Sequence, residues 1–208
     1  MSNQSASNDD LNALRAARLR QAPYLFLPAL AAWLRGWWYR ITLPALGKRF
    51  RAGPMLRVYG PLILSGPGRV EFGRDCLIIS NAIKPVCIRT LTPNAVVSLG
   101  DHAGLNGTSI QCVQSIEIGD LSNIADAYIT DSAGHTLTRD RRRRSIIDLP
   151  AQPVTIARNV WVSVQVVILA GVRIGEDSVI GACSLVRSDV PAGVFAAGNP
   201  LRVIRTLD

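Results

Sequence analysis

The chain has 208 residues, of which 48% are hydrophobic and 18% are charged, a composition that predicts a folded core and excludes intrinsic disorder. Its net charge is +8 and its isoelectric point is near 10.0, which favours anionic partners. None of the zinc-finger, RNA-binding or basic-zipper patterns accompanies this charge, so we expect no nucleic-acid partner.

The four cysteines are too irregularly spaced for a metal or redox motif. We therefore expect no metal site. The first ten residues are polar and acidic, unlike the start of a secretory signal. Both observations favour a cytoplasmic protein with reduced thiols.

Residues 1–55 are predicted to form a tail followed by an apolar helical segment. The most apolar stretch, residues 24–46, is interrupted by prolines and arginines, and its longest uninterrupted part is too short to span a bilayer. Its aromatic residues flanked by arginines are typical of a membrane interface: Trp33, Trp37, Trp38 and Tyr39. Two interpretations remain open, namely peripheral contact with the inner membrane face and packing on the protein's own domain or on a neighbouring subunit.

A six-residue period dominates the C-terminal part of the chain. β-Branched aliphatic residues recur at every sixth position: Ile156, Val162, Ile168, Ile174, Ile180 and Val186. This period predicts a parallel β-helix, in which three such units complete a triangular coil of about 18 residues. The small residues that often follow these β-branched residues allow the backbone to bend at the corners of the coil.

The same period appears earlier in the chain, but it is broken. Val58, Leu64 and Val70 are six residues apart, whereas the register slips between Ile79 and Val96. We expect an irregular or enlarged coil there. The longest interruption, residues 131–153, predicts a loop that protrudes from the coils, and such loops are commonly functional.

Three stretches resemble the hexapeptide-repeat acyltransferases, in the branch of galactoside, maltose and polysaccharide O-acetyltransferases. They are residues 105–112 (LNGTSIQC), residues 116–137 (IEIGDLSNIADAYITDSAGHTL) and residues 154–205, which include the Gly-Asn-Pro at 198–200. The resemblance implies an all-β fold with a left-handed parallel β-helix over residues 56–208. It also implies acetyl-CoA as co-substrate and a homotrimer with active sites between subunits.

The resemblance assigns catalysis to one of the two histidines. His135 matches the family's catalytic position, and an imidazole suits a base that deprotonates an acceptor hydroxyl, because its pKa lies near physiological pH. His102 is expected to be structural. Asp131 lies four residues before His135, and it either orients the imidazole ring or forms a turn.

The acceptor site is expected to include Asn106, which matches an acceptor-binding Asn of the family, together with Asp126. Asn106 could instead form a stacking ladder of the β-helix. Arg142 belongs to an arginine run at residues 141–144. This run is either a solvated loop or a site for a diphosphate-linked glycan or anionic lipid head groups.

Residues near CoA are carried over from the resemblance, and they are Trp161, Ser163, Ala182, Arg187 and Arg202. The small residues would let the pantetheine approach the backbone, and the arginines would meet its phosphates. Ser163 and Ala157 stand where the family usually has glycine. Compared with glycine, Ser163 adds bulk where CoA should pass, although its hydroxyl could also donate a hydrogen bond.

The resulting prediction is an acetyl-CoA-dependent O-acetyltransferase that acts on a sugar hydroxyl in surface-polysaccharide or lipid-linked glycan biosynthesis. The alternatives are an N-acyltransferase of an amino sugar or small amine, and a non-catalytic β-helix scaffold. A carbonic-anhydrase-like β-helix needs several zinc-binding histidines, and the two histidines of this chain argue against it.

Overall fold

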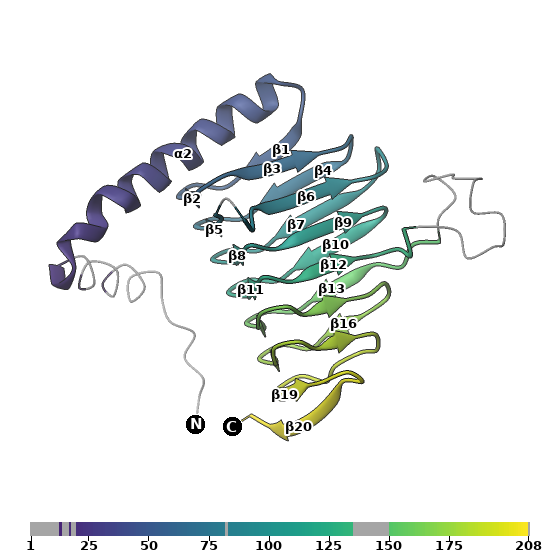
Figure 1. Cartoon of the computed structure of the whole chain (residues 1–208). Coiled ribbons are helices and arrows are strands. Elements are labelled where there is room, and N and C mark those ends of the chain that lie inside the picture. The colour runs from purple at the N-terminus through teal and green to yellow at the C-terminus, as the bar shows by residue number, and fades with distance from the viewer. Residues whose placement is uncertain (1–12, 14–16, 18–19, 82, 135–149, 208) are drawn as a thin grey trace.

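The chain coils into a left-handed β-helix with one helix at its N-terminal end (Figure 1). The computed structural model describes residues 13, 17, 20–81, 83–134 and 150–207. The strands form three sheets, here named A, B and C, and each turn of the chain contributes one strand to each sheet in that order. The fold class therefore agrees with the prediction from the six-residue period.

Sheet A contains β1 (Arg49–Ala52), β4 (Arg69–Phe72), β7 (Val96–Leu99), β10 (Ser115–Ile118), β13 (Val154–Ile156) and β16 (Arg173–Ile174). Sheet C contains β3 (Leu62–Ser65), β6 (Val86–Thr90), β9 (Ser109–Cys112), β12 (Tyr128–Thr130), β15 (Val167–Ile168) and β18 (Leu185–Val186). The first coil thus begins at Arg49, within the segment that the sequence placed ahead of the β-helix.

Sheet B contains β2 (Arg57–Tyr59), β5 (Leu77–Ile79), β8 (Gly104–Asn106), β11 (Asn123–Ala125), β14 (Trp161–Val162), β17 (Val179–Ile180), β19 (Val194–Ala197) and β20 (Arg202–Thr206). The neighbouring strands are parallel except at the C-terminal end, where β20 pairs antiparallel with β19. This reversal pairs the outer edge of β19 with β20, which becomes the exposed last strand of the sheet.

Inward-facing aliphatic side chains stack in register along each sheet. In sheet B the stack is Val58, Ile78, Leu105, Ile124, Val162, Ile180 and Ala196, all at most 1% exposed. Each side chain contacts its equivalents in the coils above and below, so that no coil buries its apolar edge alone. In sheet B the six-residue period therefore marks the inward residue of each strand, whereas strands of sheet A such as β10 and β13 bury two residues each.

The corner between sheets A and B uses the same backbone conformation in six successive coils. The corner residues with positive φ are Met55, Asp75, His102, Leu121, Asn159 and Asp177. Two residues earlier most coils carry a glycine, and a Cβ added at Gly119 would lie 2.6 Å from the carbonyl carbon of Ala157. Close stacking of the coils thus explains the small residues in the repeat.

The irregular coil predicted between Ile79 and Val96 is present. β5 ends at Ile79 and β6 begins only at Val86, which leaves an insertion between sheets B and C. The Asn81 side chain accepts hydrogen bonds from the backbone N–H groups of Ile83 and Lys84, at 2.9 and 2.7 Å. A side chain that bonds the backbone in this way stabilises a tight turn.

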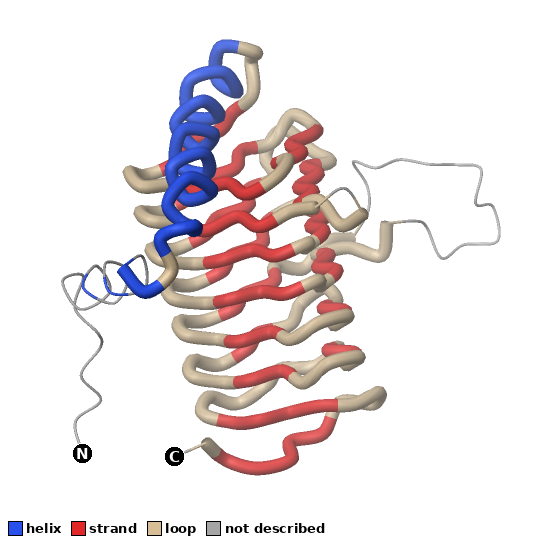
Figure 2. The backbone as a smooth tube through the Cα atoms, turned by 60° about the vertical axis from the view of Figure 1, so that its left-hand side comes forward, coloured by secondary structure: helices blue, strands red, loops and turns tan. Residues whose placement is uncertain are grey.

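The N-terminal helix closes the first coil. A short 3₁₀ helix, η1 (Pro23–Leu25), leads into α2 (Phe26–Ala45), which lies against the first coils in Figure 2. Gly36 allows this approach, because a Cβ there would lie 1.9 Å from the backbone oxygen of Leu56. The Arg35 guanidinium donates a hydrogen bond of 3.0 Å to the Val58 carbonyl.

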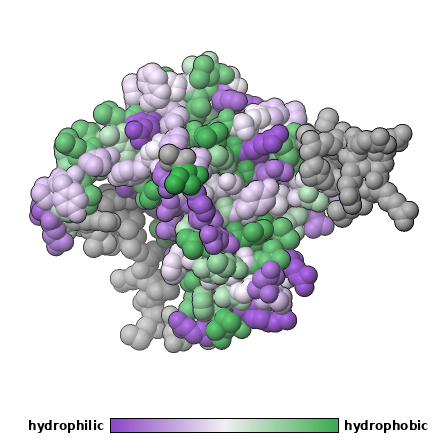
Figure 3. All heavy atoms as spheres, viewed as in Figure 1, coloured by the Kyte–Doolittle hydropathy of each residue, from purple (hydrophilic) through white to green (hydrophobic). Residues whose placement is uncertain are grey.

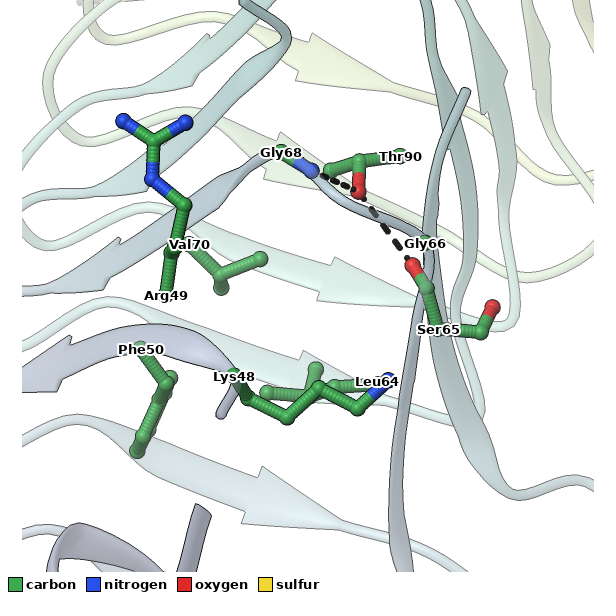
Figure 4. A pocket seen from close by; sticks show the side chains of 9 residues that line it. All are labelled: Lys48, Arg49, Phe50, Leu64, Ser65, Gly66, Gly68, Val70 and Thr90. Carbon is green, nitrogen blue, oxygen red and sulfur yellow. Dashed lines mark hydrogen bonds between the residues drawn. The ribbon is translucent and has the colours of Figure 1, made fainter. Parts of the chain in front are cut away.

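A small hollow lies between sheets C and A at the first coils (Figure 4). The buried hydroxyl of Thr90 accepts a hydrogen bond from the Gly68 N–H at 2.8 Å and donates one to the Ser65 carbonyl at 3.3 Å. A Cβ at Gly66 would lie 1.7 Å from the Thr90 carbonyl oxygen. The hollow is thus a packed corner in which the Thr90 hydroxyl is already hydrogen-bonded.

We predict that Ile124→Ala lowers the free energy of unfolding by about 2–5 kcal/mol, because it leaves a cavity between Leu105 and Val162. Ile204→Ala is the matched control, since Ile204 is 57% exposed and its truncation should change stability by less than about 0.5 kcal/mol. Urea unfolding followed by circular dichroism measures both. Equal losses in the two variants would contradict the role of the stack.

Candidate active site

Four of the predicted site residues lie on the corner between sheets B and C, here called the B–C edge. Asn106 ends β8, Asp126 follows β11, Ser163 follows β14 and Ala182 follows β17. Backbone hydrogen bonds connect these layers, from Asp126 N–H to the Asn106 carbonyl at 2.6 Å and from Ser163 N–H to the Ile180 carbonyl at 2.9 Å. The structure thus aligns two of the predicted acceptor residues and two of the predicted CoA residues along one edge.

Lys84 also lies at the B–C edge, although the sequence analysis did not identify it as a site residue. The insertion at residues 80–85 passes Gly107, where an added Cβ would lie 3.2 Å from the Lys84 Cβ. The Lys84 ammonium forms an ion pair with the Asp126 carboxylate, across 42 positions of sequence. The only sequence signal for it was the slip in register that follows Ile79.

The corner position of Asp126 recurs in the following coils. Asp126, Gln165 and Cys183 all have positive φ, at 47°, 57° and 57°. Asp adopts positive φ more readily than most residues, so the backbone conformation at this corner is one reason for an Asp at position 126. The exposed Cys183 thiol lies 3.4 Å from the Gln165 side-chain oxygen.

The remaining predicted CoA residues are spread around the last coils. Trp161 is 53% exposed and lies in β14, beside Asn123 and Val179 of sheet B. Arg202 is exposed in β20, at the C-terminal end of the same sheet. Arg187 follows β18 and is therefore at the far end of a sheet C strand, away from the B–C edge.

Asp131 lies at the other corner, between sheets C and A, and its carboxylate is buried. Its oxygens accept hydrogen bonds from the backbone N–H groups of Val113 at 2.8 Å and Gln114 at 2.6 Å. The Cys112 thiol lies 3.4 Å from the same carboxylate. Burial, together with the Asp131 charge, raises the pKa of Cys112 well above its ordinary value.

These contacts give Asp131 a structural role. Its carboxylate holds the preceding coil in place at the point where the chain leaves β12 for the long connection to β13. The connection returns beside it, because Ser132 bridges Ala151 and the Gln152 N–H donates to the Asp131 carbonyl at 2.8 Å. This structural role differs from the expected turn, because the Asp131 carboxylate bonds to the preceding coil and not to its own segment. A role in orienting His135 stays a prediction.

His135 and Arg142 lie outside the described residues. The nearest described residue, Gly134, is beside Gln111, whose side-chain nitrogen would be 3.3 Å from an added Cβ. Gln111 lies near the end of β9 in sheet C, whereas Asn106 ends β8 of sheet B, at the corner that precedes β9. A strand of four residues spans about 13 Å, so the approach to His135 and the B–C edge are separated by roughly that distance in one chain.

His102 is at the A–B corner, away from the B–C edge. Its Nδ1 lies 2.9 Å from one carboxylate oxygen of Asp75, and the Arg57 guanidinium lies 2.9 Å from the other. These contacts fit the structural role expected for His102. Among the described residues, no three or more His, Cys, Asp or Glu side chains are grouped in a way that could hold a metal ion.

Comparison with known proteins finds similar sequences and similar structures. Residues 153–188 match the family model described as bacterial transferase hexapeptide (six repeats). The chain is 42% identical over 94 residues to galactoside O-acetyltransferase of Escherichia coli K12, covering 45% of each protein. It is 36% identical over 138 residues to the galactoside O-acetyltransferase of Lactococcus lactis, covering 66% of this chain and 63% of that protein.

A solved structure of galactoside acetyltransferase in complex with coenzyme A is similar over 86% of this chain and 82% of that chain, with 26% identity and a TM-score of 0.51. The matches to the two curated relatives span less than two thirds of either relative. The six-residue repeats, the coils and these matches together show that the chain is similar to the hexapeptide-repeat transferases. Within that family it is similar to the galactoside O-acetyltransferases.

We predict that Asp131→Asn lowers the free energy of unfolding by about 1–3 kcal/mol, because an amide NH₂ would face one of the two backbone N–H donors. Asp189→Asn is the matched control, since the exposed Asp189 accepts only one such bond, from the Arg173 N–H at 2.8 Å. Thermal unfolding of both variants tests the difference. A loss no larger than that of the control would contradict the structural role given to Asp131.

Proposed function

We propose that the protein is an acetyl-CoA-dependent O-acetyltransferase that acts on a sugar hydroxyl. The observation that carries this proposal is the alignment of Asn106 and Asp126 with Ser163 and Ala182 along the B–C edge. The similarity to galactoside O-acetyltransferases and to a coenzyme A complex supports both the acyl donor and the kind of acceptor. We extend the proposal to acceptors of surface-polysaccharide or lipid-linked glycan biosynthesis.

In the proposed reaction, His135 removes the proton from the acceptor hydroxyl as its oxygen attacks the thioester carbonyl. The tetrahedral intermediate then collapses, the C–S bond breaks, and the sulfur of CoA leaves with the proton that the imidazole returns. Asn106 and the paired Asp126 orient the sugar. Because Lys84 neutralises Asp126, this edge presents hydrogen-bonding groups to a hydroxylated ligand with little net negative charge.

We further propose that a neighbouring copy completes each site in a homotrimer. Within one chain the approach to His135 and the B–C edge lie toward opposite ends of the sheet C strands. An imidazole must lie within about 3 Å of the proton it removes. A second chain whose long connection meets this B–C edge would satisfy that requirement.

The function is tested by following thiol release from acetyl-CoA with galactosides, nucleotide sugars and lipid-linked oligosaccharides as acceptors. We expect turnover with a hydroxyl acceptor and a loss of at least 100-fold in kcat for His135→Ala, as removal of a general base predicts. His102→Asn is the matched control, because it removes the other histidine and Asn tolerates the positive φ at that position. Unchanged turnover in His135→Ala would contradict the mechanism.

The position of the acyl donor is tested separately through Cys183, the exposed thiol on the B–C edge. We predict that saturating acetyl-CoA slows alkylation of Cys183 by iodoacetamide several-fold, because the pantetheine would cover the neighbouring Ala182. Peptide mass spectrometry resolves this site from Cys87, a partly exposed thiol in β6, which is the internal control. Equal alkylation of Cys183 with and without acetyl-CoA would place the donor elsewhere.

A further inference from the structure

The two faces of α2 differ in what they contact. One face packs on the first coils through Ala32 and Gly36, which are buried, and through Tyr39, whose hydroxyl accepts a hydrogen bond of 3.2 Å from the Leu62 N–H. The opposite face carries a stripe of large apolar side chains, each at least 39% exposed: Leu27, Leu30, Leu34, Trp37, Trp38 and Ile41. Their spacing places them on one side of the helix.

This stripe contains no charged residue and forms a continuous exposed surface. Figure 3 shows hydrophobic side chains exposed along the upper left of the molecule, where α2 runs. Contiguous apolar surfaces of this kind usually mark contact with a membrane or another protein. Tryptophans among leucines favour a membrane interface, because an indole buries its rings and keeps its N–H near water.

The charge of the chain is concentrated around the same helix. Residues 11–70 hold ten of the 23 Lys and Arg residues and none of the 15 Asp and Glu residues. Two of these arginines, Arg40 and Arg51, line a groove between α2 and β1 together with Trp37 and Ile41. An anionic surface placed against the apolar stripe would therefore meet positive charge beside it.

A contact with the same face of α2 in a second copy is a poorer fit. Two identical α2 faces in contact would bring the same arginines toward each other, without any acidic residue from this segment to pair with them. Anionic lipids supply both a negative surface and an apolar interior. The positive charge and the apolar stripe thus both favour anionic lipids as the binding partner of this face.

We propose that the outer face of α2 lies in the interface of an anionic lipid bilayer, with Arg40 and Arg51 near the lipid phosphates. The helix then lies parallel to the bilayer surface, with its inner face still packed on the first coils. Among the described residues, no helix has the length and apolarity needed to cross a membrane.

The test is co-sedimentation of the full-length protein with vesicles of pure phosphatidylcholine and with vesicles that contain 30% phosphatidylglycerol. We expect stronger binding to the anionic vesicles, weakened by raising the salt from about 0.05 to 0.5 M because screening shortens the range of the charges. Arg40→Gln/Arg51→Gln should lower the partition coefficient at least tenfold, from the usual effect of each basic residue near an anionic surface.

Leu34→Gln/Trp38→Gln should lower binding to a similar extent by removing apolar contacts. Val203→Gln/Ile204→Gln is the matched control, because these two exposed aliphatic residues are in β20, at the other end of the β-helix. Circular dichroism verifies that each variant is folded, and light scattering measures the mass of its oligomer. A wild-type protein that does not bind anionic vesicles would overturn the proposal. Unchanged vesicle binding in both α2 variants would also overturn it. If the wild type binds no vesicle and an α2 variant has a lower oligomer mass, α2 contacts another copy of the chain instead.

Discussion

The rest of the structure depends on the stacking of inward aliphatic side chains, in register through successive coils. Because each side chain contacts its equivalents above and below, a residue inserted within a strand would displace every contact on that face. Insertions are therefore confined to the corners. Both large departures from the six-residue period obey this constraint, since residues 80–85 leave at the B–C edge and residues 131–153 leave between sheets C and A.

The same constraint determines where polar side chains that could take part in catalysis can lie. Most inward positions are filled by aliphatic residues, with a few small hydroxyl side chains such as Ser122 and Ser178, so that larger polar side chains collect on the outer faces and at the corners. On the B–C edge the backbone turns through positive φ at Asp126, Gln165 and Cys183. Successive coils thus present a column of side chains at this corner, where we propose that CoA binds. Lys84 reaches this column because the 80–85 insertion starts there.

Much of the fold followed from the sequence, because the period of six arises from local geometry that every coil repeats. The β-branched series from Ile156 to Val186 predicted the later coils, and the series through Val58, Leu64 and Val70 predicted the earlier ones. The first strand was missed, although Phe50 is buried in it, because the arginines on both sides conceal its apolar residue.

The site was less accessible to sequence reasoning. The resemblance supplied Asn106 and Ser163, but the sequence did not reveal that they share one edge. It could not reveal the Lys84–Asp126 ion pair, which joins residues 42 positions apart through the path of an insertion. For Asp131, spacing alone left two interpretations, and the hydrogen bonds to Val113 and Gln114 show a structural role that neither of them described.

The central claim is that acetyl transfer takes place along the B–C edge. A crystal structure of the protein with bound CoA tests it most directly. The account predicts that the pantetheine lies against Ser163 and Ala182, with its thiol pointing toward Asn106 and a His135 supplied by a neighbouring copy. Density for CoA on another face of the coils, or a thiol distant from every copy of His135, would contradict the account.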